Sequence, residues 1–261
     1  MHDSPGYAEL LAAASLLVVN GILSLRFDMR VARPLLIAGL RAAVQLLLVG
    51  FLLKSVFALN SPVLVAGVLL VMLASAGWEA FSRQRSRFAG AWGYGIGIAA
   101  MAAGTFPVTA LAIVALQPRP WFAAQFTIPM FGIVLGSAMS GVSISLNAFN
   151  TALVRERAAI EAQLTLGATR HQALAMVQRD ALGGGLIPVL NQMSAAGIIT
   201  LPGMMTGQVL SGIPPLEAAK YQVFVLFLLA GATGLGTLAT VLAATYRATD
   251  ERHRLRTDRL T

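Results

Sequence analysis

About seven long apolar runs constrain the fold of this chain more than any other feature. Each run is long enough to cross a hydrocarbon core of roughly 30 Å as an α-helix. They lie at Ala8–Leu25, Leu35–Phe57, Pro62–Ala80, Gly90–Leu116, Gln125–Thr151, Ala181–Thr200 and Ala219–Tyr246. A segment in lipid must satisfy its own backbone polar groups, which a helix does. The sequence therefore predicts an all-α polytopic membrane protein with about seven transmembrane helices.

The composition supports a membrane protein. Only 11% of the residues are charged and 57% are hydrophobic, whereas about a quarter of a soluble domain is charged. The net charge of +8 does not indicate nucleic-acid binding, because the arginines lie in short loops between apolar runs, where they orient membrane proteins. No tandem repeat is visible, so we treat residues 1–261 as a single transmembrane domain.

The basic residues predict the orientation of the chain. One set of loops and the tail contain Arg26, Arg30, Arg33, Arg83, Arg85, Arg87, Arg155, Arg157, Arg170, Arg179, Arg247, Arg252, Arg254, Arg256 and Arg259. The opposite set contains only Lys54, Arg119 and Lys220. Because positive loops stay in the cytoplasm, we expect the N-terminus outside and the C-terminus in the cytoplasm. The basic tail, residues 247–261, and the polar region, residues 152–180, are then cytoplasmic.

The polar region has the pattern of a helix, a glycine turn and a second helix. Residues 152–166 are strong helix formers, with an apolar stripe at Leu153, Ile160 and Leu164 and an Arg157–Glu161 pair four residues apart. Gly167 stands where a left-handed helix cap belongs. Thr169 and Gln172 form a capping-box pattern that begins the second helix. The alternative is an ordinary solvated loop.

The sixth apolar run contains unusual breaks. It includes Gly183, Gly184, Gly185 and Pro188, and a Pro202–Gly203 pair follows. These residues predict an interrupted span followed by a short half-helix or re-entrant piece, closed by Pro214 and Pro215; the alternative is a plain kinked helix. Discontinuous helices often line substrate paths in transporters. The candidate path residues are Asn191, Gln192, Met193, Pro202, Gly203, Met204 and Met205.

Glycines four residues apart predict close helix packing. The pairs are Gly93 and Gly97, Gly132 and Gly136, and Gly203 and Gly207. We expect Gly132, Gly136, Gly203 and Gly207 to let helices approach closely, within the bundle or across a dimer seam.

Several kinds of chemistry are missing from the sequence. There is no G-x-x-x-x-G-K-[ST] phosphate loop and no Cys. No nucleophile with a base, and no metal cluster, can be assembled within the runs. A proton- or sodium-coupled carrier usually has a carboxylate in mid-membrane, and none is evident here. We therefore expect no enzyme activity and no cofactor in this chain, and energy supplied from outside through the polar region.

Several segments resemble one known family. The segment EAQLTLGATRHQA (Glu161–Ala173) resembles the coupling-helix loop of ABC-transporter permeases, which docks on the ATPase subunit. More specifically, the chain resembles the FetB-type permeases, the UPF0014 family. The similar segments are IPMFGIVLGSAMSG (Ile128–Gly141), RDALGGGLIP (Arg179–Pro188) and GIITLPGMMTGQVLSGIPPLEAAKYQ (Gly197–Gln222).

This resemblance implies a membrane permease subunit that pairs with itself and with two copies of a separate ATPase, which binds the ATP and Mg. The coupling helix lies between spans five and six. The docking residues implied are Arg157, Glu161, Leu164, Gly167, Ala168, Thr169 and Arg170. Leu164 would be the knob buried in the partner, and Gly167 the turn that sets the angle.

The resemblance does not fix the cargo. Bacterial relatives are linked to iron export, and plant relatives to aluminium tolerance through nucleotide-sugar export. We expect an exporter in iron or metal homeostasis. The alternatives are an exporter of another small molecule, a mechanotransmission subunit that transports nothing, and a self-sufficient secondary carrier. The path residues are poor in oxygen ligands, whereas hard cations prefer carboxylates. They therefore favour a chelate or another small molecule over a bare ion.

Overall fold

The computed structural model describes residues 6–28, 31–59, 61–82, 84, 87–250 and 254–260. Arg30, Arg83, Arg85 and Arg252 lie outside the described residues. Helices α1 to α10 and a short 3-10 turn at Thr257–Arg259 account for the regular structure of the described part, and no strand longer than an isolated bridge occurs there. The all-α prediction is therefore confirmed. The chain divides into two compact units, residues 1–59 and residues 60–261.

The first unit is a helical hairpin. Helices α1 (Tyr7–Arg26) and α2 (Ala32–Leu59) pack against each other. The backbone N–H of Val31 donates to the Ser24 hydroxyl at 3.1 Å, across the connection between the helices. Apolar side chains remain exposed on both helices, as expected for helices that face lipid.

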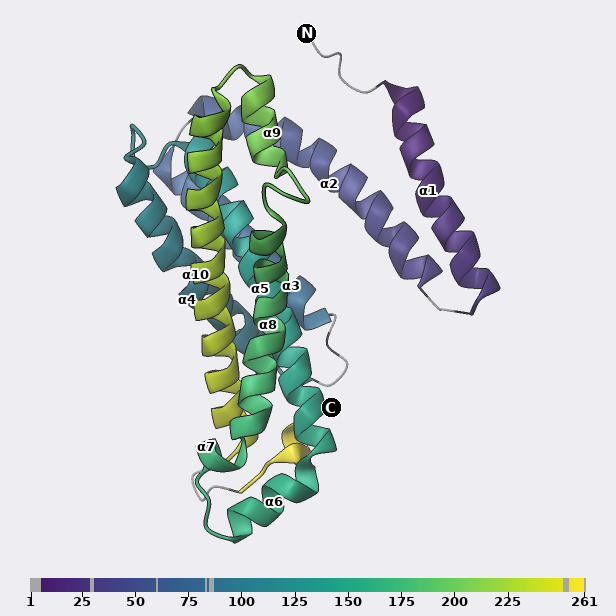
Figure 1. The fold of residues 1–261 in the computed structure, drawn as a ribbon, viewed down its shortest axis with the longest axis vertical. Helices are drawn as coiled ribbons and strands as arrows, with labels where there is room; N and C mark the ends of the chain where they lie inside the picture. Colours follow the sequence, from purple (N-terminus) through teal and green to yellow (C-terminus); the bar gives the residue numbers. More distant parts are fainter. Residues whose placement is uncertain are drawn as a thin grey trace. The chain divides into compact units, whose positions relative to one another are not determined.

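The second unit is a bundle built around one central helix (Figure 1). Its long helices are α3 (Pro62–Ser82), α4 (Trp92–Leu116), α5 (Ala124–Arg155), α8 (Ala175–Ala195) and α10 (Pro215–Ala248). Helix α5 contacts all four of the others. Two short helices, α6 (Arg157–Thr165) and α7 (Arg170–Ala173), lie at one end, and α9 (Gly203–Leu210) lies at the opposite end (Figure 1).

Within the described residues, six helices are long and apolar enough to cross a membrane: α1 to α5 and α10. The chain is therefore a multi-pass membrane protein. The sixth apolar run of the sequence forms α8, which spans 21 residues but is not among the six. Polar residues at both of its ends, from Gln178 to Asp180 and from Asn191 to Ser194, lower its hydropathy.

Helix α8 corrects one expectation and supports another. It continues without interruption through Gly183–Gly185 and Pro188, so the expected break in that stretch is wrong. Proline and glycine are tolerated in membrane helices because neighbouring helices stabilise the backbone. The chain breaks later, between Ala196 and Pro202, and Gly197 has a left-handed φ of +83°. The expected short half-helix is confirmed as α9, and α10 begins at Pro215.

Helices α5, α8 and α10 approach each other at two glycines. A Cβ atom added to Gly185 would lie 2.6 Å from Cγ2 of Thr237 and 2.9 Å from the carbonyl oxygen of Gly141. Conversely, a Cβ atom added to Gly141 would lie 3.0 Å from the carbonyl oxygen of Gly185. Neither glycine was among the expected packing positions. Only glycine leaves room for backbones this close.

The expected packing glycines behave differently within the chain. Gly136, Gly203 and Gly207 have no atom within 4 Å of an added Cβ, and Gly132 meets only the Met72 methyl group at 3.0 Å. No other helix in the described part of the chain therefore approaches Gly136, Gly203 or Gly207 closely. Packing across a dimer seam stays a prediction.

We predict that Gly185→Ala destabilises the bundle by about 1–3 kcal/mol, the usual cost of overpacking, because its methyl group meets backbone atoms of α5. The melting temperature in detergent measures this. The matched control is Gly183→Ala on the same helix, where an added Cβ meets nothing within 4 Å. Equal melting temperatures for the two variants would contradict the close approach.

Candidate functional site

The polar region folds as two short helices that follow α5. Helix α5 ends at Arg155, and Glu156 leaves helical geometry with φ −94° and ψ 13° before α6 begins at Arg157. The expected continuous helix over residues 152–166 is therefore two helices. The bend at Glu156 lets α6 turn back beneath the bundle (Figure 1). Its apolar stripe then reaches the core instead of continuing along the axis of α5.

The apolar stripe is confirmed, and it faces this chain's own core. Leu153 and Ile160 are buried in one cluster with Leu174 and Val177, and Leu164 packs partly buried against that cluster. We call the buried residues of this set the basal cluster. Its buried members also include Phe88, Leu146, Phe149, Ala173, Ala181, Val241, Ala244 and Ala248. Helix α6 is thus seated on residues from α5, α7, α8 and α10.

Of the large apolar side chains between residues 152 and 180, Leu166 is the most exposed. It is 88% exposed, whereas Leu164, the expected knob, packs against the chain itself. The sequence contained the signal for this difference. Once Leu164 is assigned to the inner stripe, a residue two positions later lies about 200° further around a helix, on the outer side. Leu166 was not among the docking residues predicted from the sequence.

The turn after α6 has the expected local structure. Gly167 adopts φ +91°, and its N–H donates to the Leu164 carbonyl at 3.1 Å. The N–H of Thr169 donates to Oε1 of Gln172 at 2.8 Å, and the N–H of Gln172 donates to the Thr169 hydroxyl at 3.4 Å. The glycine cap and the capping box are confirmed. Ala168 is half-buried against the basal cluster.

The charged pair on α6 is present but exposed. Arg157 and Glu161 form an ion pair at 2.8 Å, with side chains 57% and 45% exposed. Exposed helical pairs contribute little stability, about 0.3–0.5 kcal/mol. Both side chains are therefore accessible to a second protein. Arg170, in contrast, lies with its guanidinium carbon 5.1 Å from the ring centroid of Tyr246 on α10.

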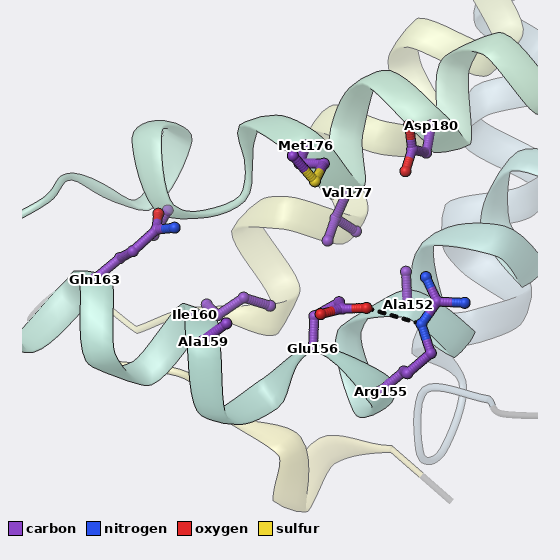
Figure 2. A pocket seen from close by; sticks show the side chains of 10 residues that line it. Ala152, Arg155, Glu156, Ala159, Ile160, Gln163, Met176, Val177 and Asp180 are labelled. Atoms are coloured by element: carbon purple, nitrogen blue, oxygen red, sulfur yellow. Dashed lines mark hydrogen bonds and ion pairs between the residues drawn. The ribbon is translucent and has the colours of Figure 1, made fainter.

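A groove separates α6 from α7 and α8 (Figure 2). It has a volume of about 160 Å³. Ile160 and Val177 contribute apolar side chains to its wall, and Arg155 and Glu156 form an ion pair at 2.8 Å beside it. The other lining residues are Ala152, Ala159, Gln163, Ala173, Met176 and Asp180. Met176 is 75% exposed, so the groove offers an apolar surface with a charged rim.

Side-chain contacts connect α7 and α8 to the end of α10. The Gln178 amide donates to the Thr245 hydroxyl at 2.8 Å. The rings of His171 and Tyr246 meet edge to face, with centroids 5.9 Å apart. Together with the Arg170–Tyr246 contact, these interactions join the polar region to a third long helix. The sequence offered no local signal for them, because the partners are far apart along the chain.

The described part of the basic tail is folded against the bundle. The N–H of Ala89 donates to the Arg259 carbonyl at 2.8 Å, and Leu255 and Leu260 pack against the basal cluster. Arg256 and Asp258 form a pair at 2.8 Å. The hydrogen bond from Arg256 lowers the pKa of Asp258 to about 2. This pair therefore stays ionised at any physiological pH.

The candidate path residues lie in two different environments. Asn191 and Gln192 are exposed at the end of α8, whereas Met193 and Met204 pack partly buried against a cluster that includes Val189 and Val225. Met205 is half-buried, and Pro202 and Gly203 form the start of α9. The structure thus does not bring the amides and all the methionines onto one surface. Gln208 on α9, which we did not single out, has a buried Oε1 without a hydrogen-bond partner in the described structure.

The described residues contain no cluster of side chains that would form a metal-binding site. In those residues, no group of three or more His, Cys, Asp or Glu side chains is placed to hold a metal ion. The exposed amides and half-buried thioethers near α9 are neutral, weak ligands. They suit contacts with a polar organic molecule better than capture of a hard cation.

Comparison with known proteins identifies the family of this chain. Residues 7–249 match the family described as "Uncharacterised protein family (UPF0014)". The chain is 37% identical over 219 residues to a UPF0014 membrane protein of Synechocystis, slr1647, covering 84% of each chain. It is 32% identical over 248 residues to the Escherichia coli protein named "Probable iron export permease protein FetB", covering 95% of this chain and 94% of that one.

A plant relative is similarly close. The rice protein named "UPF0014 membrane protein STAR2" is 32% identical over 233 residues, covering 89% of this chain and 80% of that one. No solved structure matches the chain. The match over nearly its whole length shows that this multi-pass membrane protein belongs to the UPF0014 family.

Proposed function

We propose that this chain is the membrane permease subunit of an ATP-driven (ABC) exporter that acts in iron or metal homeostasis. In this proposal two copies of the chain pair with each other and with two copies of a separate ATPase, which binds ATP and Mg. The observation that carries the proposal is the α6–Gly167–α7 turn. It presents the exposed Leu166 on a firmly buried base. The similarity to FetB supports the permease role and the choice of iron.

The distribution of charge supports a cytoplasmic position for α6 and α7. The described arginines at their end of the bundle are Arg87, Arg155, Arg157, Arg170, Arg179, Arg247, Arg254, Arg256 and Arg259. At the α9 end of this unit the basic residues are Arg119 and Lys220. The excess of positive charge marks the cytoplasmic side. A cytoplasmic ATPase would then meet Leu166 directly, in the inner membrane of a bacterium.

The contacts around α6 suggest how force would pass into the membrane. Ile160 packs with Leu153 of α5 and Val177 of α8 in the basal cluster. Gln178 and Arg170 contact Thr245 and Tyr246 of α10. A displacement of α6 and α7 by the ATPase would thus reach α5, α8 and α10 together. Packed interiors transmit strain because they have little free volume.

We predict that Leu166→Glu prevents stable binding of the ATPase, because a charge replaces the apolar side chain that enters the partner. A hot-spot side chain contributes at least about 2 kcal/mol, roughly a thirtyfold change in affinity. Co-purification of the two proteins and titration in detergent measure the loss.

The matched control is Ile198→Glu, which changes an apolar side chain that is 90% exposed in the loop between α8 and α9. It should leave ATPase binding unchanged. Equal loss in both variants would point to general damage, and normal binding by Leu166→Glu would exclude Leu166 as the docking side chain.

We predict that Gly167→Val uncouples ATP hydrolysis from transport, because a β-branched residue is strained at φ +91° by about 1–3 kcal/mol. The comparison is Gly167→Asn, since Asn tolerates positive φ better than Val. The Asn variant should retain more of the ATPase stimulation by the permease. Identical activities for wild type and Gly167→Val would show that the turn angle does not matter.

The surface near α9 favours a chelate or a polar small molecule as cargo. Asn191 and Gln192 are exposed, and Gln208 has an unsatisfied buried oxygen. A polar surface of this kind is unfavourable against lipid, so a second copy of the chain and the cargo path are the natural neighbours. A nucleotide sugar would satisfy the same amides, which is why another small molecule remains the second candidate.

We predict that Asn191→Ala combined with Gln192→Ala lowers transport severalfold while ATPase binding stays normal. Vesicles with the complete complex, loaded with chelated iron, provide the measurement. The control is Leu190→Ala, a neighbouring exposed residue on α8 that is apolar. Wild-type transport by the double variant would reject the path, and ATPase binding without transport of any cargo by the wild type would favour a mechanotransmission subunit.

A further inference from the structure

Two helices of the bundle end their exposed apolar stripes with an aromatic residue at the α6 end. On α4 the exposed stripe runs through Trp92, Ala99, Ala103, Phe106, Ala110 and Val114. On α10 it runs through Val223, Phe227, Leu235, Leu238, Leu242 and Tyr246. At 1.5 Å per residue these stripes measure about 33 Å and about 35 Å, enough to cover the roughly 30 Å of a hydrocarbon core.

The stripe lengths indicate where the two aromatic rings lie relative to the membrane. Trp92 begins the α4 stripe and Tyr246 ends the α10 stripe, and both are exposed by 58–59%. Helices α4 and α10 pack against each other, and α7 lies at the end of the bundle where α6 lies (Figure 1). Trp and Tyr gather where the hydrocarbon core meets the headgroups. The two rings therefore mark the level of the phospholipid headgroups on one side of the bundle.

An arginine lies against each of these rings. The guanidinium carbon of Arg247 lies 4.9 Å from the centroid of the Trp92 ring, and that of Arg170 lies 5.1 Å from the centroid of the Tyr246 ring. Arg259 joins them, because its Nη1 donates to the Arg247 carbonyl at 2.9 Å. The guanidinium groups of Arg247 and Arg259 thus lie near each other at this end of α10, and Arg170 lies against the adjacent residue Tyr246.

The arginines there outnumber the described carboxylates: Asp258 attracts Arg247 and Arg259, but it is already hydrogen-bonded to Arg256. Arg256 is paired with Asp258, and Arg254 with Asp250. Among the described side chains, Arg247 and Arg259 form no ion pair with a carboxylate, and the buried Nε of Arg247 has no hydrogen-bond partner. A buried N–H of a charged group without an acceptor is costly.

We propose that Arg247 and Arg259, beside Trp92, bind the headgroup of an anionic phospholipid in the cytoplasmic leaflet. The apolar stripes of α4 and α10 take the acyl chains, and the guanidinium groups take the phosphate. Basic pockets between helices on the cytoplasmic side are suited to such headgroups, and Arg recognises phosphate with two parallel hydrogen bonds. This site requires the proposed orientation of the chain, but neither the ATPase nor the cargo.

The site also adjoins the proposed docking region. Arg170 belongs to α7 and contacts Tyr246, the residue that precedes Arg247 on α10. A lipid bound at Arg247 would therefore lie one residue along α10 from the contact between α7 and α10, in the region where the ATPase is proposed to act. The lipid composition of the membrane would then influence the stability of this joint.

The test uses the purified full-length chain in neutral detergent. Phosphatidylglycerol or phosphatidylcholine is titrated in, and native mass spectrometry counts the bound lipids while the melting temperature is followed. We expect phosphatidylglycerol to bind at least about tenfold more tightly, since each Arg near the surface favours an anionic lipid. Arg247→Gln should reduce this preference to about threefold or less. Arg119→Gln, the same charge change at the opposite end, should leave the preference intact.

Other outcomes would overturn the proposal. The first is equal binding of the two lipids by the wild type, which requires no variant and so does not depend on the folding of Arg247→Gln. The second is an equal loss of preference in Arg119→Gln. The third is equal stabilisation by inorganic phosphate at the same concentration, which would show a phosphate site without lipid recognition. Trp92→Leu keeps all the charges and should weaken the preference, because it removes the ring beneath Arg247.

Discussion

The burial of Ile160 in the basal cluster is the contact on which the α6 end of the structure depends. Helix α6 is nine residues long, too short to be stable in water by itself. Its position is fixed because Ile160 packs with Leu153, Leu174 and Val177. Burying one such side chain contributes about 1.5–3 kcal/mol. Without that contact, the α6–Gly167–α7 turn would be an unattached loop, and Leu166 would have no fixed position.

The sequence predicted the features that depend on neighbouring residues. The left-handed Gly167 and the Thr169–Gln172 capping box both form as expected, because each is decided within four residues. The apolar runs predicted about seven spans; six of them form helices long and apolar enough to cross a membrane, and the later half-helix forms as α9. The stripe at Leu153, Ile160 and Leu164 was also correct as a pattern. The predicted partner of Leu164 was wrong, because periodicity shows that a face is apolar without showing what covers it.

The features that failed depend on partners far away in the chain. Gly183–Gly185 was read as a break, but Gly185 serves the close approach of α8 to α5 and α10. Gly136, Gly203 and Gly207 had the spacing for helix packing, yet their surroundings within the chain are open. Spacing alone cannot separate these cases, because the decisive fact is which helix lies opposite. The same reason explains why Gly141 and the contacts of Tyr246 were missed.

The basal cluster also explains why the tail and the α3–α4 connection matter at this end. Phe88 is fully buried in the cluster, and Leu255 and Leu260 cover it from the tail. The tail brings Arg259 to the carbonyl of Arg247, so the packing that supports α6 also brings together the two arginines of the proposed lipid site, with Arg247 beside Trp92. One buried contact region thus links a proposed protein-docking turn with a proposed lipid site. A change in either ligand would be felt by the other through these shared side chains, without any rearrangement in the middle of the membrane.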